Sequence, residues 1–91
     1  MSVTVRVPAQ LRTLTGGAGE VGVEGSTVGE ALKALDAANP GFGERLFDES
    51  GALRRFVNVF LADEDVRFLE GLDTPVADGQ TLSIVPAVAG G

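Results

Sequence analysis

One stretch of this 91-residue chain has the repeat of an amphipathic helix, and the rest of the chain must pack around it. Thr27 and Glu30 match a capping box, in which the Thr hydroxyl accepts a backbone N–H and the Glu side chain reaches back to another. Asn39-Pro40-Gly41 then ends the helix. Between these signals the apolar residues recur every three or four positions and form one stripe: Val28, Ala31, Leu32, Leu35 and Ala38.

The remaining apolar residues follow the two-residue alternation of β-strands. Strands are expected at 3–7 and 21–23, joined as a hairpin through the glycine-rich segment 16–19, and at 55–61. A short strand is expected near 66–68, and a final strand at 81–85, after which Pro86 should stop the pairing. Segment 42–47 has room for one short helical turn.

The predicted order is β-β-α-β-β-β, with only one long helix. A mixed sheet whose inner face packs on that helix buries both apolar patterns, so the fold class is α+β of the ubiquitin-like β-grasp type. We expect one domain over residues 1–86 and a flexible C-terminal tail over 87–91.

Composition restricts the chemistry of this domain. The chain has no His and no Cys, which removes the most common acid–base, nucleophilic and transition-metal side chains. Catalysis of its own and a bound metal are therefore not expected. The net charge of −6 repels nucleic acid and anionic membranes and favours a partner with a basic surface. No apolar run is long enough to span a bilayer, and no signal peptide precedes the first strand, so a cytoplasmic location is expected.

The chain ends in five small residues, Ala87-Val88-Ala89-Gly90-Gly91. A terminal carboxylate without neighbouring side chains can enter a narrow channel in another protein, where a Cβ would collide with the wall. Measured from Pro86, an extended tail of this length spans about 17 Å. We therefore predict that Gly91, supported by Gly90, is the reactive end of the chain, and that residues 86–89 contact a partner.

Three further residues are predicted to contact a partner because of where the strand alternation places them. Phe56 and Phe60 lie on the side of their strand opposite Val57 and Val59, and an exposed apolar pair of this kind often marks an interaction site. The alternative for both phenylalanines is a second small core beneath segment 42–47. Val85 is the third candidate, because it points outward close to the tail.

Two other motifs are better explained without a ligand. Asp63-Glu64-Asp65 lacks the longer loop and the spaced ligands of an EF-hand, so it is interpreted as a polar turn. The glycines of 16–19 are not followed by Lys-Ser or Lys-Thr, so they do not form a phosphate-binding loop. Arg6 and Arg67 are candidate charged contacts at the rim of an interface.

These residues resemble the MoaD/ThiS family of ubiquitin-like sulfur carriers over nearly the whole chain. The resemblance rests on the ending Pro-Ala-Val-Ala-Gly-Gly and on three internal segments: Phe56-Val57-Asn58, Asp63 to Phe68, and Asp78-Gly79. Arg55 to Asn58, Asp65 to Phe68 and the tail are most similar to family members that supply sulfur for cysteine synthesis.

The resemblance implies a carrier that partner enzymes act on. An adenylating and sulfurating enzyme of the ubiquitin-activating type would use ATP to activate Gly91, and a sulfur donor would then convert the terminus to a thiocarboxylate. In the cysteine pathway the acceptor would be a pyridoxal-phosphate-dependent cysteine synthase, and a metallopeptidase would release the cysteine. The carrier itself would bind no cofactor.

Three alternatives to the cysteine pathway use the same terminus. The chain could be the small subunit of molybdopterin synthase, a sulfur donor to a secondary-metabolite pathway, or a ubiquitin-like protein modifier. The identity of the partner distinguishes them.

Overall fold

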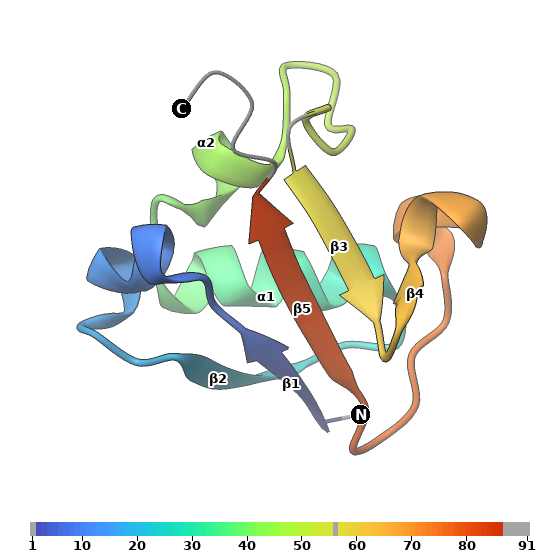
Figure 1. Cartoon of the computed structure of the whole chain (residues 1–91), viewed down its shortest axis with the longest axis horizontal. Coiled ribbons are helices and arrows are strands. Elements are labelled where there is room, and N and C mark those ends of the chain that lie inside the picture. Colours follow the sequence, from blue (N-terminus) through green and yellow to red (C-terminus); the bar gives the residue numbers. More distant parts are fainter. Residues whose placement is uncertain (1, 56, 87–91) are drawn as a thin grey trace.

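The structure is a computed structural model, and it describes residues 2–55 and 57–86. A five-stranded sheet packs with one face on a single long helix (Figure 1). The strands are β1 (Ser2–Arg6), β2 (Glu20–Glu24), β3 (Val57–Leu61), β4 (Glu64–Asp65) and β5 (Thr81–Pro86). The helices are α1 (Val28–Ala38) and α2 (Phe42–Leu46), with 3-10 helices η1 (Ala9–Thr15), η2 (Val66–Phe68) and η3 (Gly71–Asp73).

The strand order in the sheet is β2-β1-β5-β3-β4. The last strand, β5, lies in the centre, parallel to β1 and antiparallel to β3. β1 and β2 form the predicted antiparallel pair, with Val5 opposite Val21. The mixed sheet on one main helix confirms the predicted β-grasp class.

The core lies between α1 and the inner face of the sheet. The helix contributes four of its five predicted stripe residues, while Ala38 in its last turn is exposed. The strands contribute the aliphatic residues that alternation assigned to one face, and α2 covers the end of the core with Phe42 and Leu46. Several of these side chains are completely inaccessible to solvent: Val5, Val28, Leu32, Leu35, Phe42, Leu46, Val59 and Leu82.

The capping box at the start of α1 is present in a modified form. The Glu30 backbone N–H donates to Thr27 Oγ1 at 3.1 Å, as predicted. The Glu30 carboxylate reaches one residue further back than expected and accepts from Ser26 N at 2.9 Å and Ser26 Oγ at 2.8 Å. These hydrogen bonds from Ser26 favour the charged form and lower the pKa of Glu30.

The prediction of a strand near 66–68 is wrong. This segment forms the 3-10 helix η2, and the short strand β4 comes directly before it. The cause is Asp65, whose Oδ1 accepts the Arg67 backbone N–H at 2.9 Å and closes a tight turn. Pro86 also differs from expectation, because it pairs with Val57 as the last residue of β5. Proline lacks only the N–H donor, so its presence does not prevent the strand from ending there.

The connection between β1 and β2 contains a 3-10 helix that was not predicted. Leu11 in η1 is buried in the main core, and Leu14 packs against the core from the same segment. Gly16 ends η1 with a φ of +69°, a left-handed conformation that glycine adopts without steric cost. The glycine-rich segment is thus the end of a helical connection between two paired strands.

Candidate functional site: the tail exit and the outward sheet face

The central strand β5 determines where the C-terminal tail leaves the domain. Its last residue, Pro86, is paired with Val57 at the end of the sheet where β3 begins (Figure 1). The tail therefore starts from the middle of the sheet, between the ends of two neighbouring strands. The predicted reactive residues Gly90 and Gly91, and the predicted contacts Ala87, Val88, Ala89 and Phe56, lie outside the described residues.

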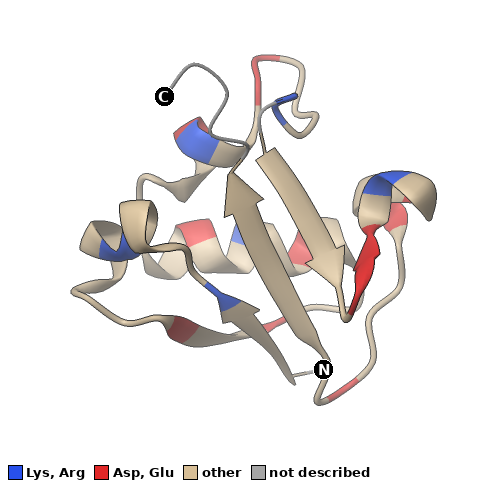
Figure 2. Cartoon of the chain, in the orientation of Figure 1, with Lys and Arg blue, Asp and Glu red and all other residues tan. Residues whose placement is uncertain are grey.

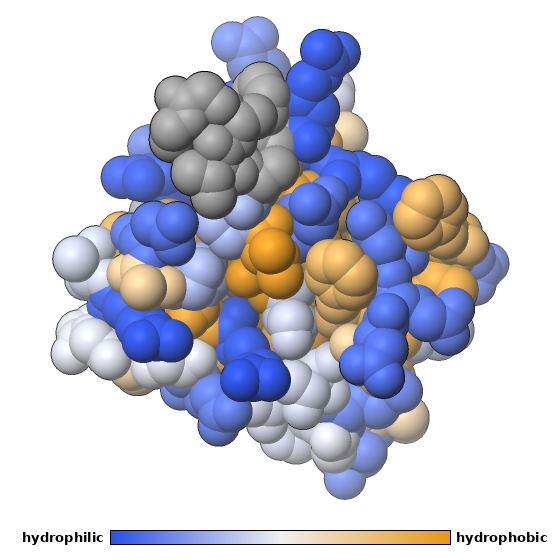
Figure 3. Space-filling view, in the orientation of Figure 1, coloured by the Kyte–Doolittle hydropathy of each residue, from blue (hydrophilic) through white to orange (hydrophobic). Residues whose placement is uncertain are grey.

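The face of the sheet opposite α1 is open next to this exit. Val85 is 44% exposed there, and its neighbour across the sheet is Asn58 of β3. Phe60 lies opposite Ser83 on the same face and is partly exposed. Figure 3 shows apolar surface over the middle of this face, surrounded by hydrophilic residues. The structure thus places Phe60 and Val85 on the outward face of the sheet, as the strand alternation predicted, and Pro86 at the end of the sheet where the tail leaves.

The alternative of a second core beneath segment 42–47 does not describe Phe60. Phe42 is fully buried in the main core, and Phe47 packs against that same core. Phe60 remains on the outward face, away from both. Its position is compatible with contact to a partner, and that role remains a prediction.

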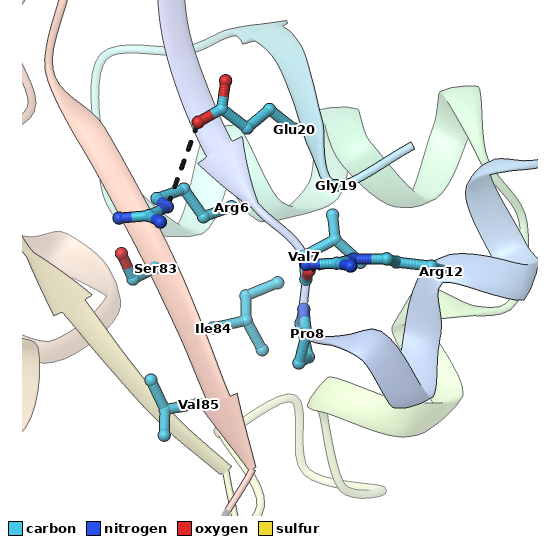
Figure 4. Close-up of a pocket in the computed structure, with 9 residues that line it drawn as sticks. All are labelled: Arg6, Val7, Pro8, Arg12, Gly19, Glu20, Ser83, Ile84 and Val85. Atoms are coloured by element: carbon cyan, nitrogen blue, oxygen red, sulfur yellow. Dashed lines mark hydrogen bonds and ion pairs between the residues drawn. The ribbon is translucent and has the colours of Figure 1, made fainter. Parts of the chain in front are cut away.

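An open cavity of about 650 Å³ adjoins Val85 on the β1 side. Figure 4 shows that side chains from β1, the start of η1, the start of β2 and the end of β5 surround it. Its lining combines two arginines, one carboxylate and aliphatic groups: Arg6, Val7, Pro8, Arg12, Gly19, Glu20, Ser83, Ile84 and Val85. The cavity and the exposed Val85 together form one surface beside the tail exit.

The two arginines of this cavity are held differently. Arg12 Nε donates to the Val7 carbonyl at 3.0 Å, which ties its side chain to the end of β1. Arg6 Nε lies 3.9 Å from Glu20 Oε2, and both side chains are about two-thirds exposed, at 66% and 65%. An ion pair this exposed contributes little to stability. Both cations therefore lie where carboxylates of a docked protein could contact them.

Arg12 was not predicted as a site residue. It lies in the connection between β1 and β2, where a hairpin loop was expected, and the packing of η1 against the end of β1 brings it to the same cavity as Val85. No local pattern around Arg12 indicates this contact.

Within residues 2–55 and 57–86, no group of three or more His, Cys, Asp or Glu side chains is arranged to hold a metal ion. Among the helices of the described part of the chain, none combines the length and apolar character needed to cross a membrane.

Comparison with known proteins identifies the family of this chain. The ThiS family model matches residues 5–91. The sulfur carrier protein CysO of Mycobacterium tuberculosis is 50% identical over 93 aligned residues, covering 100% of both chains. Small archaeal modifier protein 3 of Haloferax volcanii is 39% identical over 66 residues, covering 72% of this chain and 71% of the relative.

A solved structure shows the same fold in a complex. The crystal structure of the Amycolatopsis orientalis BexX/CysO complex contains a chain that superposes with a TM-score of 0.91 at 49% identity, covering 98% of this chain and 99% of that one. The match extends through sequence, fold and length. This chain belongs to the ThiS family and is a sulfur carrier protein with the β-grasp fold.

Proposed function

We propose that this chain carries sulfur as a thiocarboxylate on Gly91 and supplies it for cysteine biosynthesis. The observation that carries this proposal is the full-length similarity to CysO, at 50% identity, in a chain that ends in Gly-Gly. The fold supports it, because the central strand β5 ends at Pro86 beside an open, partly apolar face. A partner could dock on that face while the five residues beyond Pro86 reach into its active site.

The chemistry requires two group transfers at the terminal carboxyl group. A carboxylate oxygen of Gly91 attacks the α-phosphorus of ATP, pyrophosphate leaves, and an acyl-adenylate forms. A sulfide sulfur then attacks the carbonyl carbon, the C–O bond to AMP breaks, and AMP departs with that electron pair. The product is a C-terminal thiocarboxylate. Adenylation is needed because a free carboxylate is a poor electrophile.

In these steps the carrier positions its terminal carboxylate and keeps it accessible to the partner enzymes. With no His or Cys, it has no side chain suited to act as a general base near pH 7 or as a thiol nucleophile. The small residues at its end allow the terminus to enter a channel that would exclude larger side chains. Partner enzymes therefore supply the acid–base groups and bind the ATP.

The proposed partners follow from the order of the chemistry. An adenylating and sulfurating enzyme loads Gly91. On a pyridoxal-phosphate-dependent cysteine synthase the thiocarboxylate sulfur would bond to the side-chain carbon of the new cysteine, and an S-to-N acyl shift would then leave that cysteine joined to Gly91 by an amide bond. A metallopeptidase would hydrolyse this amide bond, which releases cysteine and restores the terminal carboxylate. ATP, pyridoxal phosphate and the metal belong to these enzymes. The BexX/CysO complex supports docking of a carrier with this fold onto another protein.

Removing Gly90 and Gly91 tests the role of the terminus. We expect the shortened chain to keep its fold, because both residues lie beyond β5, and to lose sulfur loading by the adenylating enzyme with ATP and sulfide. A second comparison uses one matched change at two glycines. Gly91→Ala should slow loading, whereas Gly22→Ala, where a Cβ meets nothing within 4 Å, should load normally. Normal loading of the shortened chain would refute the proposal.

A second candidate function is attachment to other proteins, and the similarity to small archaeal modifier protein 3 favours it. The same acyl-adenylate would then react with a lysine amine and form an isopeptide bond. Lys33 is the only lysine of the chain, so polymers of this protein could grow only through Lys33 or the N-terminus. Isopeptide-linked products that disappear when Gly90 and Gly91 are deleted would support this candidate.

A further inference from the structure

The 3-10 helix η2 exposes an aromatic side chain that the fold does not use. Phe68 is 86% exposed and the adjacent Leu69 is 39% exposed. Figure 3 shows an apolar projection on the right of the molecule, where Figure 1 places η2 beyond β4. An aromatic ring this exposed costs solubility, and apolar groups grouped on a surface often mark an interaction site.

The turn that carries Phe68 is firmly held. Asp65 Oδ1 accepts the Arg67 backbone N–H at 2.9 Å, and the Leu69 N–H donates to the Val66 carbonyl at 2.9 Å. Val66 is completely buried beneath the turn. A side chain presented on such a preorganised turn loses little backbone entropy when it binds.

Arg67 connects this turn to the place where the tail leaves the domain. Its Nη1 donates to Asn58 Oδ1 at 2.7 Å, and its Nη2 donates to the Arg54 carbonyl at 2.6 Å. The same Arg54 carbonyl accepts the N–H of Val57 at 3.0 Å, and Val57 pairs with Pro86. The Phe68 turn is thus linked by hydrogen bonds to the strand end beside the tail exit.

The surroundings of Phe68 indicate the chemistry of what it would bind. Exposed carboxylates flank the turn at Glu64 and Glu70, and Figure 2 shows acidic β4 next to it. A small cavity of about 330 Å³ beside the turn has a mostly aliphatic lining that includes Leu53 and Leu72. A protein with an apolar pocket and a cationic rim complements this surface. A second copy of this chain does not, because it carries the same carboxylates and a net charge of −6.

We propose that Phe68, supported by Leu69, is a docking residue for the adenylating enzyme and inserts into an apolar pocket of that enzyme flanked by Lys or Arg. The inference rests on the proposed function, since that enzyme must bind the body of the carrier while it takes in the tail. The tail consists of small residues that provide few distinguishing contacts. Phe68 and its acidic flank therefore contribute to recognition of this carrier over others.

The test measures ATP–pyrophosphate exchange with the purified adenylating enzyme encoded in the same genome, at varied concentrations of the carrier. Phe68→Ala should raise the KM for the carrier about tenfold and leave kcat unchanged, because the loss is in binding. Glu70→Lys should raise KM at low salt and less so at high salt. Lys33→Ala, an exposed change on α1, is the matched control and should behave as wild type. Thermal melting should be the same for all four proteins, because Phe68 is 86% exposed.

Each other outcome has a defined meaning. An unchanged KM for Phe68→Ala, with exchange lost on deletion of Gly90 and Gly91, overturns the docking role and leaves the proposed function intact. No exchange with the wild-type chain overturns the proposed function and this inference with it. A wild-type dimer in size-exclusion chromatography that Phe68→Ala converts to a monomer assigns the surface to a second copy and also overturns the inference.

Discussion

The two faces of the sheet use the same strands for different purposes. On the inner face Val5 and Ile84 are buried in the core that packs on α1, whereas on the outer face the next residues along the same strands, Arg6 and Val85, are exposed. Because side chains alternate along a strand, each residue serves either stability or recognition, and the next residue serves the other. Substitutions on the two faces should therefore separate the free energy of unfolding from the affinity for partners.

The largest loss of stability is expected from a truncation on the inner side. Leu32 of α1 is completely buried in the core. Leu32→Ala removes buried apolar volume and leaves a cavity, so the free energy of unfolding should fall by about 3 kcal/mol in urea titration. Lys33→Ala, one residue away on the exposed side, should change it by less than about 0.5 kcal/mol. Equal effects of the two substitutions would contradict the assignment of faces.

A smaller loss is expected where the chain approaches the first turn of α1. A Cβ on Gly25 would lie 2.7 Å from the backbone nitrogen of Ala31 and 3.0 Å from its Cα. Because backbone atoms cannot move aside as a side chain can, Gly25→Ala should cost about 1 to 3 kcal/mol. Gly22→Ala, with open space around its Cβ, is the control for the same chemical change. A melting temperature for Gly25→Ala equal to that of the control would show that this contact is not tight.

On the outer face the expected change in stability is small and the expected change in recognition is large. Val85 is 44% exposed, so Val85→Asp should alter the free energy of unfolding by about 0.5 kcal/mol or less. The new carboxylate would be desolvated against an apolar partner surface, so we expect the KM of the adenylating enzyme for the carrier to rise about tenfold. Unfolding measurements and exchange kinetics on the same preparation check both statements. A Val85→Asp chain that is destabilised but keeps the wild-type KM would contradict the assignment of Val85 to the partner-binding face.

The smallest effect is expected in a loop that belongs to neither face. Ser50 donates from Oγ at 2.6 Å and from its backbone N at 2.9 Å to Asp48 Oδ1. These bonds lower the pKa of Asp48. The resulting stabilisation is present above the unfolded-state pKa of about 3.9 and is lost as the pH falls through the lower folded-state value. Asp48→Asn should therefore weaken the dependence of stability on pH below about pH 4 in acid titrations, and an unchanged slope would contradict the assignment.

Sequence patterns predicted the two faces well because alternation is a local property of a strand. Val57 and Val59 face the core, and Phe60 and Val85 face outward, as their positions in the sequence require. The capping residue Thr27 also starts α1 as expected, since its side chain bonds to Glu30, only three residues further along the chain. The terminal Gly-Gly was recognisable because its proposed role depends on position in the chain rather than on folding.

The features that were missed depend on turns and on distant packing. In a strand Val66 and Phe68 would share one face, yet Val66 is completely buried and Phe68 is 86% exposed. The Asp65 side chain closes a turn at this point, and the strand-forming residues after it do not indicate that turn. Arg12 lines the same cavity as Val85 because η1 packs against the end of β1, and this meeting of segments far apart in the chain has no local sequence signal.

The central claim is that Gly91 becomes a thiocarboxylate, and the intact mass of the protein tests it most directly. After incubation with ATP, the adenylating enzyme and sulfide, the mass should rise by the difference between one sulfur and one oxygen atom, and fragmentation should assign that increase to Gly91. The chain without Gly90 and Gly91 should keep its mass. An unchanged mass of the full chain, with an enzyme shown to load a related carrier, would contradict the account, as would a sulfur atom located anywhere other than the C-terminus.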